Sequence, residues 1–311
     1  MQFLWDFFVA PFLDMIEFPI FLAEVAVSGL LTGVMYSLVA LGFVLIFKAS
    51  QVFNFAQGAM VLFAALTLVG VMEFGVPVWG ALPVTAIVMV GLAFVIERGM
   101  LRPLINQPPI TLFMATIGLS FLLEGAGEWL WGSNVKALDL GIPSSPVDVG
   151  GMLLNEFDLI AALVAAVLVG VLALIFQYTP MGRALRAVAD DPQAALSLGI
   201  SLRTIWIIVW SVAGIVAIVA GIMWGAKSGV QFSLSLIALK ALPVLILGGL
   251  TSVPGAIVGG LIIGLGEKIA EIYWGPVIGG AIENWFAYML AMLVLMFRPQ
   301  GLFGEKIIER V

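Results

Sequence analysis

The densest group of charged side chains lies in a hydrophilic stretch, residues 178–203, between two long apolar runs. Five charged residues fall within it although only 10% of the chain is charged, namely Arg183, Arg186, Asp190, Asp191 and Arg203. Their chemistry is that of ionic contacts. Because so many charges are costly in hydrocarbon, we expect this stretch to lie outside the lipid and to meet a partner there.

The order of residues within this stretch predicts two short helices. Residues 181–188, MGRALRAV, favour a helix with Arg183 and Arg186 three positions apart on one face. The DDP sequence at 190–192 ends that helix and offers Asp191 as the N-cap of the next, with Pro192 as its first residue. The alternative is an ordinary loop whose arginines only set topology. The alanine-rich pattern favours a structured surface on which another protein can dock.

Several kinds of chemistry are excluded by residues that the sequence lacks. Cysteine and histidine are both absent, which removes disulfides, thiolate nucleophiles, imidazole bases and the usual zinc and haem ligands. No G-x-x-x-x-G-K-[ST] motif occurs, so the chain has no P-loop to hold ATP phosphates. We expect no catalytic residue, metal or cofactor in this chain, with ATP and Mg²⁺ bound by separate subunits if the process uses them.

The elements that position these residues are membrane spans. Hydrophobic residues make up 62% of the 311 residues and the mean hydropathy is +1.18, more apolar surface than one water-soluble core buries. A spanning helix needs about 20 apolar residues. Six stretches of that length carry no charge: 25–47, 52–72, 74–96, 103–123, 159–182 and 204–226.

A further uncharged region, residues 241–266, is interrupted by TSVPG at 251–255. This pattern predicts a broken helix near Pro254, with a short helix over 237–250 and a second from 256 to about 270. The short helix would be only about 21 Å long, so we expect its turn to be sheltered by a partner subunit or by the 178–203 stretch. A last span is predicted from about 276 to 297. The predicted fold is an all-α polytopic bundle of eight or nine spans in one domain, 1–311.

The distribution of lysine and arginine predicts orientation. If 178–203 is cytoplasmic, nine basic residues lie inside (Lys48, Arg98, Arg102, Arg183, Arg186, Arg203, Arg298, Lys306 and Arg310) and three outside (Lys136, Lys227 and Lys268). The N-terminus is then outside, and residues 298–311 form a cytoplasmic tail. Residues 1–18 are predicted to form an interfacial segment along the outer membrane surface, helical over 3–18.

Polar residues within the apolar runs are candidates for a translocation path, because such groups face a cavity or another helix. These residues are Asn54, Gln57, Thr116, Ser120, Thr251 and Ser252. The alternative is hydrogen bonding between helices. Lys240 either pairs with an acidic residue or extends to the outer surface, and we favour the surface. Glu267 and Glu271 are interpreted as part of a solvated helix end.

The stretch MGRALRAVADDPQAALSLGI at 181–200 resembles the coupling loop of the LivH-type permeases, membrane subunits of ABC importers for branched-chain amino acids and related solutes. VFNFAQGA at 52–59, KALPVLILGGLTSVPGAIVGGLIIGLGE at 240–267 and FRPQGLFGE at 297–305 resemble other segments of that family in the same order. The resemblance extends from about residue 28 nearly to the end. Gln57 and Ala59 stand where the family pattern often has His and Glu, so a proton or charge role shared with the family is not carried over.

The resemblance implies a multi-pass subunit of the bacterial inner membrane that forms half of a translocation path. Its implied partners are a LivM-type second permease, two cytoplasmic ATPase subunits bound through residues 181–200, and a periplasmic solute-binding protein; no nucleic acid is implied. Branched-chain amino acids are the first solute class, with urea, short amides or another small polar solute as the alternative. An ion-coupled carrier is less favoured because the spans carry almost no paired carboxylates. A scaffold without transport activity is the third hypothesis.

Overall fold

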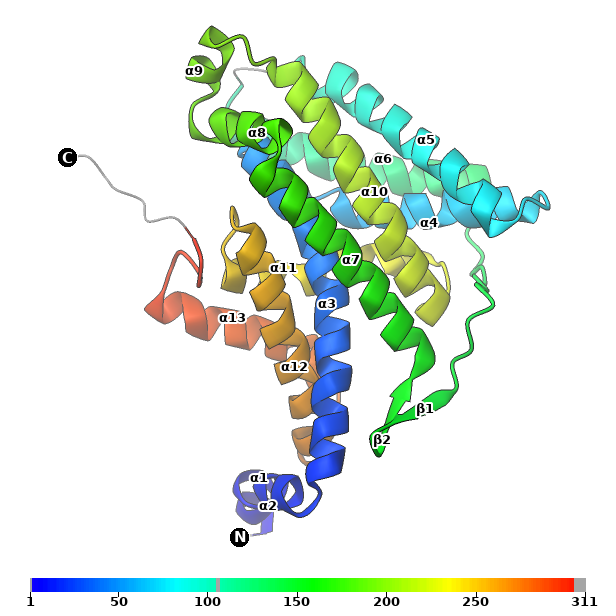
Figure 1. Ribbon diagram of the computed structural model, residues 1–311, viewed down its shortest axis with the longest axis vertical. Helices are drawn as coiled ribbons and strands as arrows, with labels where there is room; N and C mark the ends of the chain where they lie inside the picture. The colour runs from blue at the N-terminus through cyan, green and yellow to red at the C-terminus, as the bar shows by residue number, and fades with distance from the viewer. Residues whose placement is uncertain (1, 105–106, 305–311) are drawn as a thin grey trace. The chain divides into compact units, whose positions relative to one another are not determined.

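The computed structural model describes residues 2–104 and 107–304, most of which are helical (Figure 1). The prediction of a helical bundle is confirmed, with one short β-hairpin in addition. In chain order the helices are α1 (Gln2–Phe8), α2 (Ala10–Glu17), α3 (Pro19–Ser50), α4 (Gln57–Glu73), α5 (Val78–Ile96), α6 (Pro109–Trp131), α7 (Glu156–Tyr178), α8 (Pro180–Asp190), α9 (Pro192–Ser197), α10 (Leu202–Ser228), α11 (Ile237–Gly248), α12 (Val253–Ile278) and α13 (Phe286–Phe297). The hairpin strands are β1 (Pro146–Val149) and β2 (Met152–Asn155), paired antiparallel.

Six helical segments in the described residues are long and apolar enough to cross a membrane: Pro19–Ser50, Val78–Leu101, Ile110–Trp131, Glu156–Tyr178, Leu202–Ser228 and Val253–Ile278. Three shorter apolar segments are Gln57–Glu73, Phe232–Gly248 and Phe286–Phe297. The predicted span over 52–72 is wrong at its start, because residues 51–56 form a loop and α4 begins at Gln57. Composition alone does not reveal this loop, since most of its residues are apolar.

The chain divides into two compact units. One comprises Met1–Ser37, Gly141–Val167 and Lys240–Val311, and the other Leu38–Leu140 and Leu168–Leu239. Three of the four boundaries fall within α3, α7 and α11, and the fourth lies between Leu140 and Gly141 in the connection before β1. The described part of the first unit ends at residue 304, so residues 305–311 of the predicted tail lie outside the described residues.

The core of the second unit is α4, which contacts α5, α6, α10 and the 3₁₀ turn Phe232–Leu236 (Figure 1). Every residue of α4 from Gln57 to Gly70 is buried. Glycines allow this close packing: a β-carbon at Gly221 on α10 would lie 2.7 Å from the Val61 carbonyl oxygen. A helix that is apolar on all sides belongs in a protein interior.

In the first unit, α3 and α12 pack through two matching G-x-x-x-G sequences. Gly29 and Gly33 on α3 face Gly264 and Gly260 on α12, and a β-carbon at Gly33 would lie 2.5 Å from the Gly260 carbonyl oxygen. Ser37 Oγ lies 2.9 Å from the Gly33 carbonyl oxygen and 3.2 Å from that of Ile257. Small residues thus bring the two backbones together, as is common between helices in lipid.

The predicted break near Pro254 is confirmed. The short helix α11 ends at Gly248, Gly249 has a φ of 106°, and the Ser252 hydroxyl accepts a hydrogen bond from Gly255 N at 3.0 Å to cap α12. The expected shelter of this turn by a partner subunit or by the 178–203 stretch stays a prediction. The chain's own tail covers the turn, with Leu302 N donating to the Leu247 carbonyl at 2.8 Å and Phe303 N to the Gly248 carbonyl at 3.0 Å.

The predicted last span, 276–297, is wrong at its start. Helix α12 continues through Pro276 to Ile278, and the chain then reverses through Gly279, Gly280 and Ala281, all with positive φ. Helix α13 begins only at Phe286 and is about 18 Å long. A proline this close to a helix end interrupts little, because few hydrogen bonds remain to be made beyond it.

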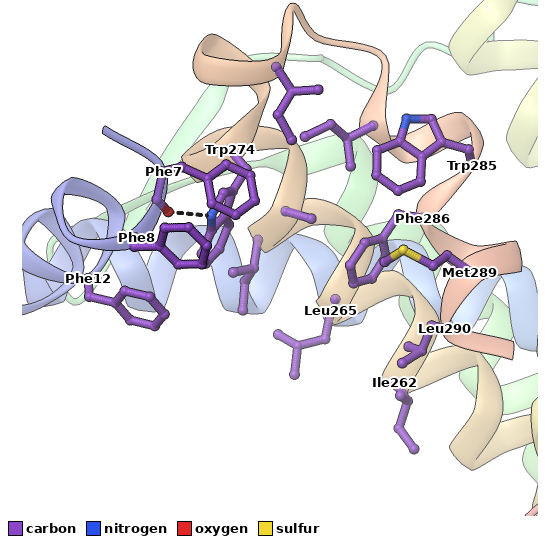
Figure 2. A pocket seen from close by; sticks show the side chains of 15 residues that line it. Phe7, Phe8, Phe12, Ile262, Leu265, Trp274, Trp285, Phe286, Met289 and Leu290 are labelled. Atoms are coloured by element: carbon purple, nitrogen blue, oxygen red, sulfur yellow. Dashed lines mark hydrogen bonds between the residues drawn. The ribbon is translucent and has the colours of Figure 1, made fainter. Parts of the chain in front are cut away.

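The N-terminal segment is helical as predicted, as two helices, α1 and α2. Aromatic residues attach it to α12: Trp274 Nε1 donates to the Phe7 carbonyl at 3.0 Å, and the rings of Phe12 and Trp274 meet edge to face at 5.6 Å (Figure 2). In the same unit, Leu153 N of the hairpin donates to Glu24 Oε2 on α3 at 3.0 Å. These contacts attach the N-terminal helices to α12 and the hairpin to α3.

Candidate functional site

The predicted pair of short helices in 178–203 is present as α8 and α9. Thr179 caps α8 by accepting from Gly182 N at 3.3 Å. The predicted N-cap role of Asp191 is confirmed, since its Oδ1 accepts from Gln193 N at 2.9 Å and from Ala194 N at 3.0 Å, with Pro192 in the first turn. These caps satisfy backbone donors that otherwise lack intrahelical partners, and so stabilise two helices too short to persist alone.

The two arginines of α8 differ in their contacts. Arg186 Nη1 donates to the Phe176 carbonyl at 2.5 Å and Nη2 to the Gln177 carbonyl at 3.3 Å. Arg186 therefore binds the C-terminal carbonyls of α7, where a cation is also favoured by the helix dipole. Arg183 is exposed. On the sequence alone, Arg183 and Arg186 lie on one helix face and are both expected to contact a partner. The contacts instead make Arg186 a positioning residue, and they leave Arg183 accessible to a partner.

The accessible surface of this elbow, residues 178–203, is both charged and apolar. Asp190, Asp191 and Pro192 are exposed, and so are two leucines, Leu196 at 51% and Leu198 at 79%. The apolar side of α8 is buried through Gly182, Leu185 and Val188. These leucines do not stand out in the sequence, because the mainly apolar segment ALSLGI at 195–200 is typical of a buried helix. The five predicted coupling residues, Arg183, Arg186, Asp190, Asp191 and Pro192, thus lie on the consecutive short helices α8 and α9 and at the junction between them.

An ion pair at the start of α10 was also missed. Arg203 Nε lies 3.7 Å from Glu97 Oε2, and Glu97 is 1% exposed within the π-helical turn Glu97–Leu101 that follows α5. A carboxylate this deeply buried needs a cationic partner. The pair joins the end of α5 to the first turn of α10, at the last residue of the elbow.

Three of the predicted path residues come together at the loop before α4. Asn54, Gln57 and Thr116 are all buried. Asn54 Oδ1 accepts from Ala56 N at 3.1 Å, and Thr116 Oγ1 accepts from Phe55 N at 3.3 Å. The buried Gln57 Nε2 has no hydrogen-bond partner among the described residues. Asn54 and Thr116 therefore hold the loop, while Gln57 keeps an unused donor.

The other three predicted path residues are less buried. Ser120 lies one turn beyond Thr116 on α6 and is half-buried. Thr251 and Ser252 belong to the other unit, in the turn between α11 and α12, where Ser252 is the cap described above. Both are half-buried.

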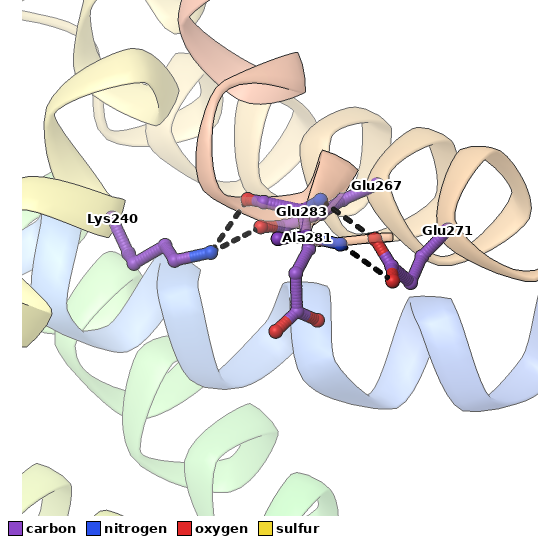
Figure 3. Close-up of polar contacts among 5 residues, drawn as sticks. All are labelled: Lys240, Glu267, Glu271, Ala281 and Glu283. Atoms are coloured by element: carbon purple, nitrogen blue, oxygen red, sulfur yellow. Dashed lines mark hydrogen bonds and ion pairs between the residues drawn. The ribbon is translucent and has the colours of Figure 1, made fainter. Parts of the chain in front are cut away.

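A partly buried polar network joins α11, α12 and the turn after α12 (Figure 3). Lys240 Nζ donates to Glu267 Oε1 and to the Glu283 carbonyl, each at 2.6 Å. Glu271 accepts from Ala281 N at 3.1 Å and from Glu283 N at 3.0 Å. The Tyr36 hydroxyl also hydrogen-bonds to Glu267.

This network corrects two expectations. Lys240 pairs with an acidic residue instead of extending to the surface, and Glu267, at 4% exposed, is not part of a solvated helix end. An ion pair this far from water needs further hydrogen bonds, and Tyr36 supplies one to Glu267 and the Glu283 carbonyl one to Lys240. Glu271 supplies an acceptor for the strained Ala281, a non-glycine residue with a φ of 57°.

Residues 25–298 match the family model described as "Branched-chain amino acid transport system / permease component". The chain belongs to this family. It is therefore a permease subunit of an ABC-type transporter and a multi-pass membrane protein, not itself an enzyme.

Curated relatives cover most of this permease. It is 30% identical to the high-affinity branched-chain amino acid transport system permease protein BraD of Pseudomonas aeruginosa, over 92% of this chain and 96% of that one. It is 26% identical to the corresponding LivH protein of Escherichia coli K12, over 91% and 96%. A more distant relative is the autoinducer 2 import system permease protein LsrC of Yersinia enterocolitica, 27% identical over 67% and 56%.

Proposed function

We propose that this permease forms half of the translocation path of an ATP-driven importer for branched-chain amino acids or similar small solutes, and is driven through residues 181–200. The exposed surface of the elbow carries this proposal. Arg183, Asp190, Leu196 and Leu198 are accessible on two capped helices, while Arg186 and Gly182 attach α8 to the end of α7. A rigid, partly apolar surface flanked by charges has the composition of a protein-binding site.

The proposed assembly follows the family. It comprises this chain, a LivM-type second permease, two ATPase subunits that hold ATP and Mg²⁺, and a solute-binding protein. In the proposed topology the chain is a single permease domain of the bacterial inner membrane, with eight or nine spans. The N-terminus lies outside, and residues 178–203 and 298–311 lie in the cytoplasm.

The proposed path residues are Asn54, Gln57, Thr116, Ser120, Thr251 and Ser252. Within this set we assign different roles. Asn54 and Thr116 position the loop before α4, and Gln57 offers the buried amide donor that lacks a partner among the described residues. An unsatisfied buried donor is costly, and a polar solute would satisfy it.

The coupling proposal is tested by charge reversal at Arg183 in the reconstituted importer. Arg183→Glu is expected to weaken ATPase binding by about tenfold and to reduce ATP-driven uptake in proportion, since an interface arginine contributes about 1–2 kcal/mol. Arg98→Glu is the matched control, because Arg98 is an exposed arginine of the same unit outside the elbow. Equal ATPase binding by the two variants would contradict the proposal.

Other solutes and another energy source are the alternatives. Urea, short amides and, given the relative LsrC, autoinducer 2 are the competing solutes. The partly buried Lys240–Glu267 pair is the kind of charged group that an ion-coupled carrier uses, and such a carrier is the less favoured alternative. Competition between labelled leucine and each solute in vesicles distinguishes the solutes. Uptake that persists without ATP but stops when ion gradients are dissipated would establish the carrier instead.

A further inference from the structure

An apolar groove lies between the N-terminal helices and the turn from α12 to α13 (Figure 2). Its volume is about 660 Å³, within the range of about 300–1,000 Å³ that ligand pockets have. One wall carries the rings of Phe8, Phe12 and Trp274, the other those of Trp285 and Phe286 (Figure 2). All 15 lining residues are apolar, aromatic or glycine, so the groove is suited to a hydrocarbon ligand.

The groove also has few of the hydrogen-bonding groups that a polar solute requires, and no side-chain oxygen acceptor among its lining residues. The indole N–H of Trp274 is already bonded to the Phe7 carbonyl. No lining residue carries a charge or a hydroxyl, and the one other side-chain donor among the lining residues is the indole N–H of Trp285. The groove therefore discriminates against amino acids and other small polar solutes, and none of its lining residues is among those proposed for their path.

The membrane supplies a hydrocarbon ligand at this position. Helix α12 is one of the six helices long and apolar enough to cross the bilayer, and α1 and α2 expose large apolar side chains, among them Trp5 at 55% and Phe8 at 62%. Amphipathic helices of this kind lie at the boundary between headgroups and acyl chains. An acyl chain that enters the groove leaves its headgroup beside α1 and α2.

The charge of these two helices selects the headgroup. Asp6, Asp14 and Glu17 are the charged residues of α1 and α2, and the first basic residue of the chain is Lys48. Asp14 and Glu17 are exposed. An acidic rim repels a net anionic headgroup and attracts an ammonium group. We propose that the groove binds one acyl chain of a zwitterionic phospholipid whose headgroup carries an amine, of the phosphatidylethanolamine type.

Native mass spectrometry of the purified full-length chain tests the proposal, with phosphatidylethanolamine and phosphatidylglycerol of identical acyl chains as probes. One bound phosphatidylethanolamine is expected, retained over phosphatidylglycerol by at least about fivefold, the effect of one favourable charge near a headgroup. Met289→Trp, at a lining position on α13, should lower its retention by about tenfold, since each methylene kept out of the groove costs about fourfold. Met292→Trp is the matched control: it lies one turn on, is exposed and does not line the groove.

The headgroup assignment has its own variant, which leaves the groove unchanged. The triple substitution Asp6→Asn, Asp14→Asn and Glu17→Gln should bring the ratio of phosphatidylethanolamine to phosphatidylglycerol close to one while an acyl chain still binds. If Met289→Trp does not fold, the ratio of retained phosphatidylethanolamine to phosphatidylglycerol in the triple variant still tests the proposal. Equal retention in the Met289 and Met292 variants, a preference for phosphatidylglycerol in the unaltered chain, or loss of the lipid once the second permease is bound would each overturn the proposal.

Discussion

Lys240 Nζ and Glu267 Oε1 lie 2.6 Å apart, although the residues are 27 positions apart and each stands in a mainly apolar helix. The turn near Pro254 lies midway between them, 14 residues after Lys240 and 13 before Glu267, so antiparallel packing of α11 on α12 brings them level. The pair closes this helical hairpin at the end opposite its turn. The Glu283 carbonyl, bonded to the same ammonium, attaches the following turn as well.

Breaking this pair should destabilise the protein more than removing the charge of the neighbouring, half-buried Lys268. Glu267→Gln is expected to cost about 3 kcal/mol, because it leaves a largely buried ammonium without its counter-charge. The double variant Lys240→Met with Glu267→Gln should recover part of that loss. Thermal unfolding in detergent measures both, with Lys268→Met as the control. An unchanged melting temperature for Glu267→Gln would show that the pair contributes nothing.

Arg186 and Arg183 should respond differently to alanine substitution. Arg186→Ala removes two hydrogen bonds to the carbonyls that end α7, so amide exchange in 176–190 should accelerate by about tenfold, equivalent to about 1–1.5 kcal/mol. Arg183→Ala should leave that exchange unaltered and affect only ATPase binding. Hydrogen–deuterium exchange with mass spectrometry makes the comparison. The same protection in both variants would mean that Arg186 does not position α8.

The adjacent residues Asp190 and Asp191 offer a matched test of the cap. Asp191→Ala should destabilise α9 by about 1 kcal/mol, because Gln193 N and Ala194 N lose their acceptor. Asp191→Asn should retain most of the helix, and Asp190→Ala should leave it intact. Exchange protection of peptides covering 192–198 reports on α9. A larger effect at Asp190 than at Asp191 would count against the capping assignment.

Glycine substitutions should separate packed from open helix surfaces. At Gly33 a β-carbon would lie 2.5 Å from the Gly260 carbonyl oxygen, so Gly33→Ala should separate α3 from α12 and lower the melting temperature. At Gly170 on α7 a β-carbon meets nothing within 4 Å among the described residues, and Gly170→Ala should stabilise by up to about 1 kcal/mol through helix propensity. Equal melting temperatures for the two variants would argue against close packing of α3 on α12.

Local spacing was enough to predict several features of this permease. Charge-free runs predicted the helical membrane class, DDP predicted Asp191 as a cap, and TSVPG predicted the break before α12. Each depends on neighbours within a few residues, because backbone preference, capping and hydrophobic length act over that range. The family resemblance depended on the same short motifs.

Contacts between distant residues decided the rest. Four features depend on contacts that the sequence does not reveal. They are the start of α4, the pairing of Lys240 with Glu267, the attachment of Arg186 to α7, and the hydrogen bonds from Leu302 and Phe303 that cover the turn after α11. An isolated lysine in an apolar run gives no sign of its partner, and an arginine on a helix face gives no sign of which carbonyls it reaches. Tertiary packing decides both, because a buried charge or carbonyl takes whichever partner the fold brings within hydrogen-bonding distance.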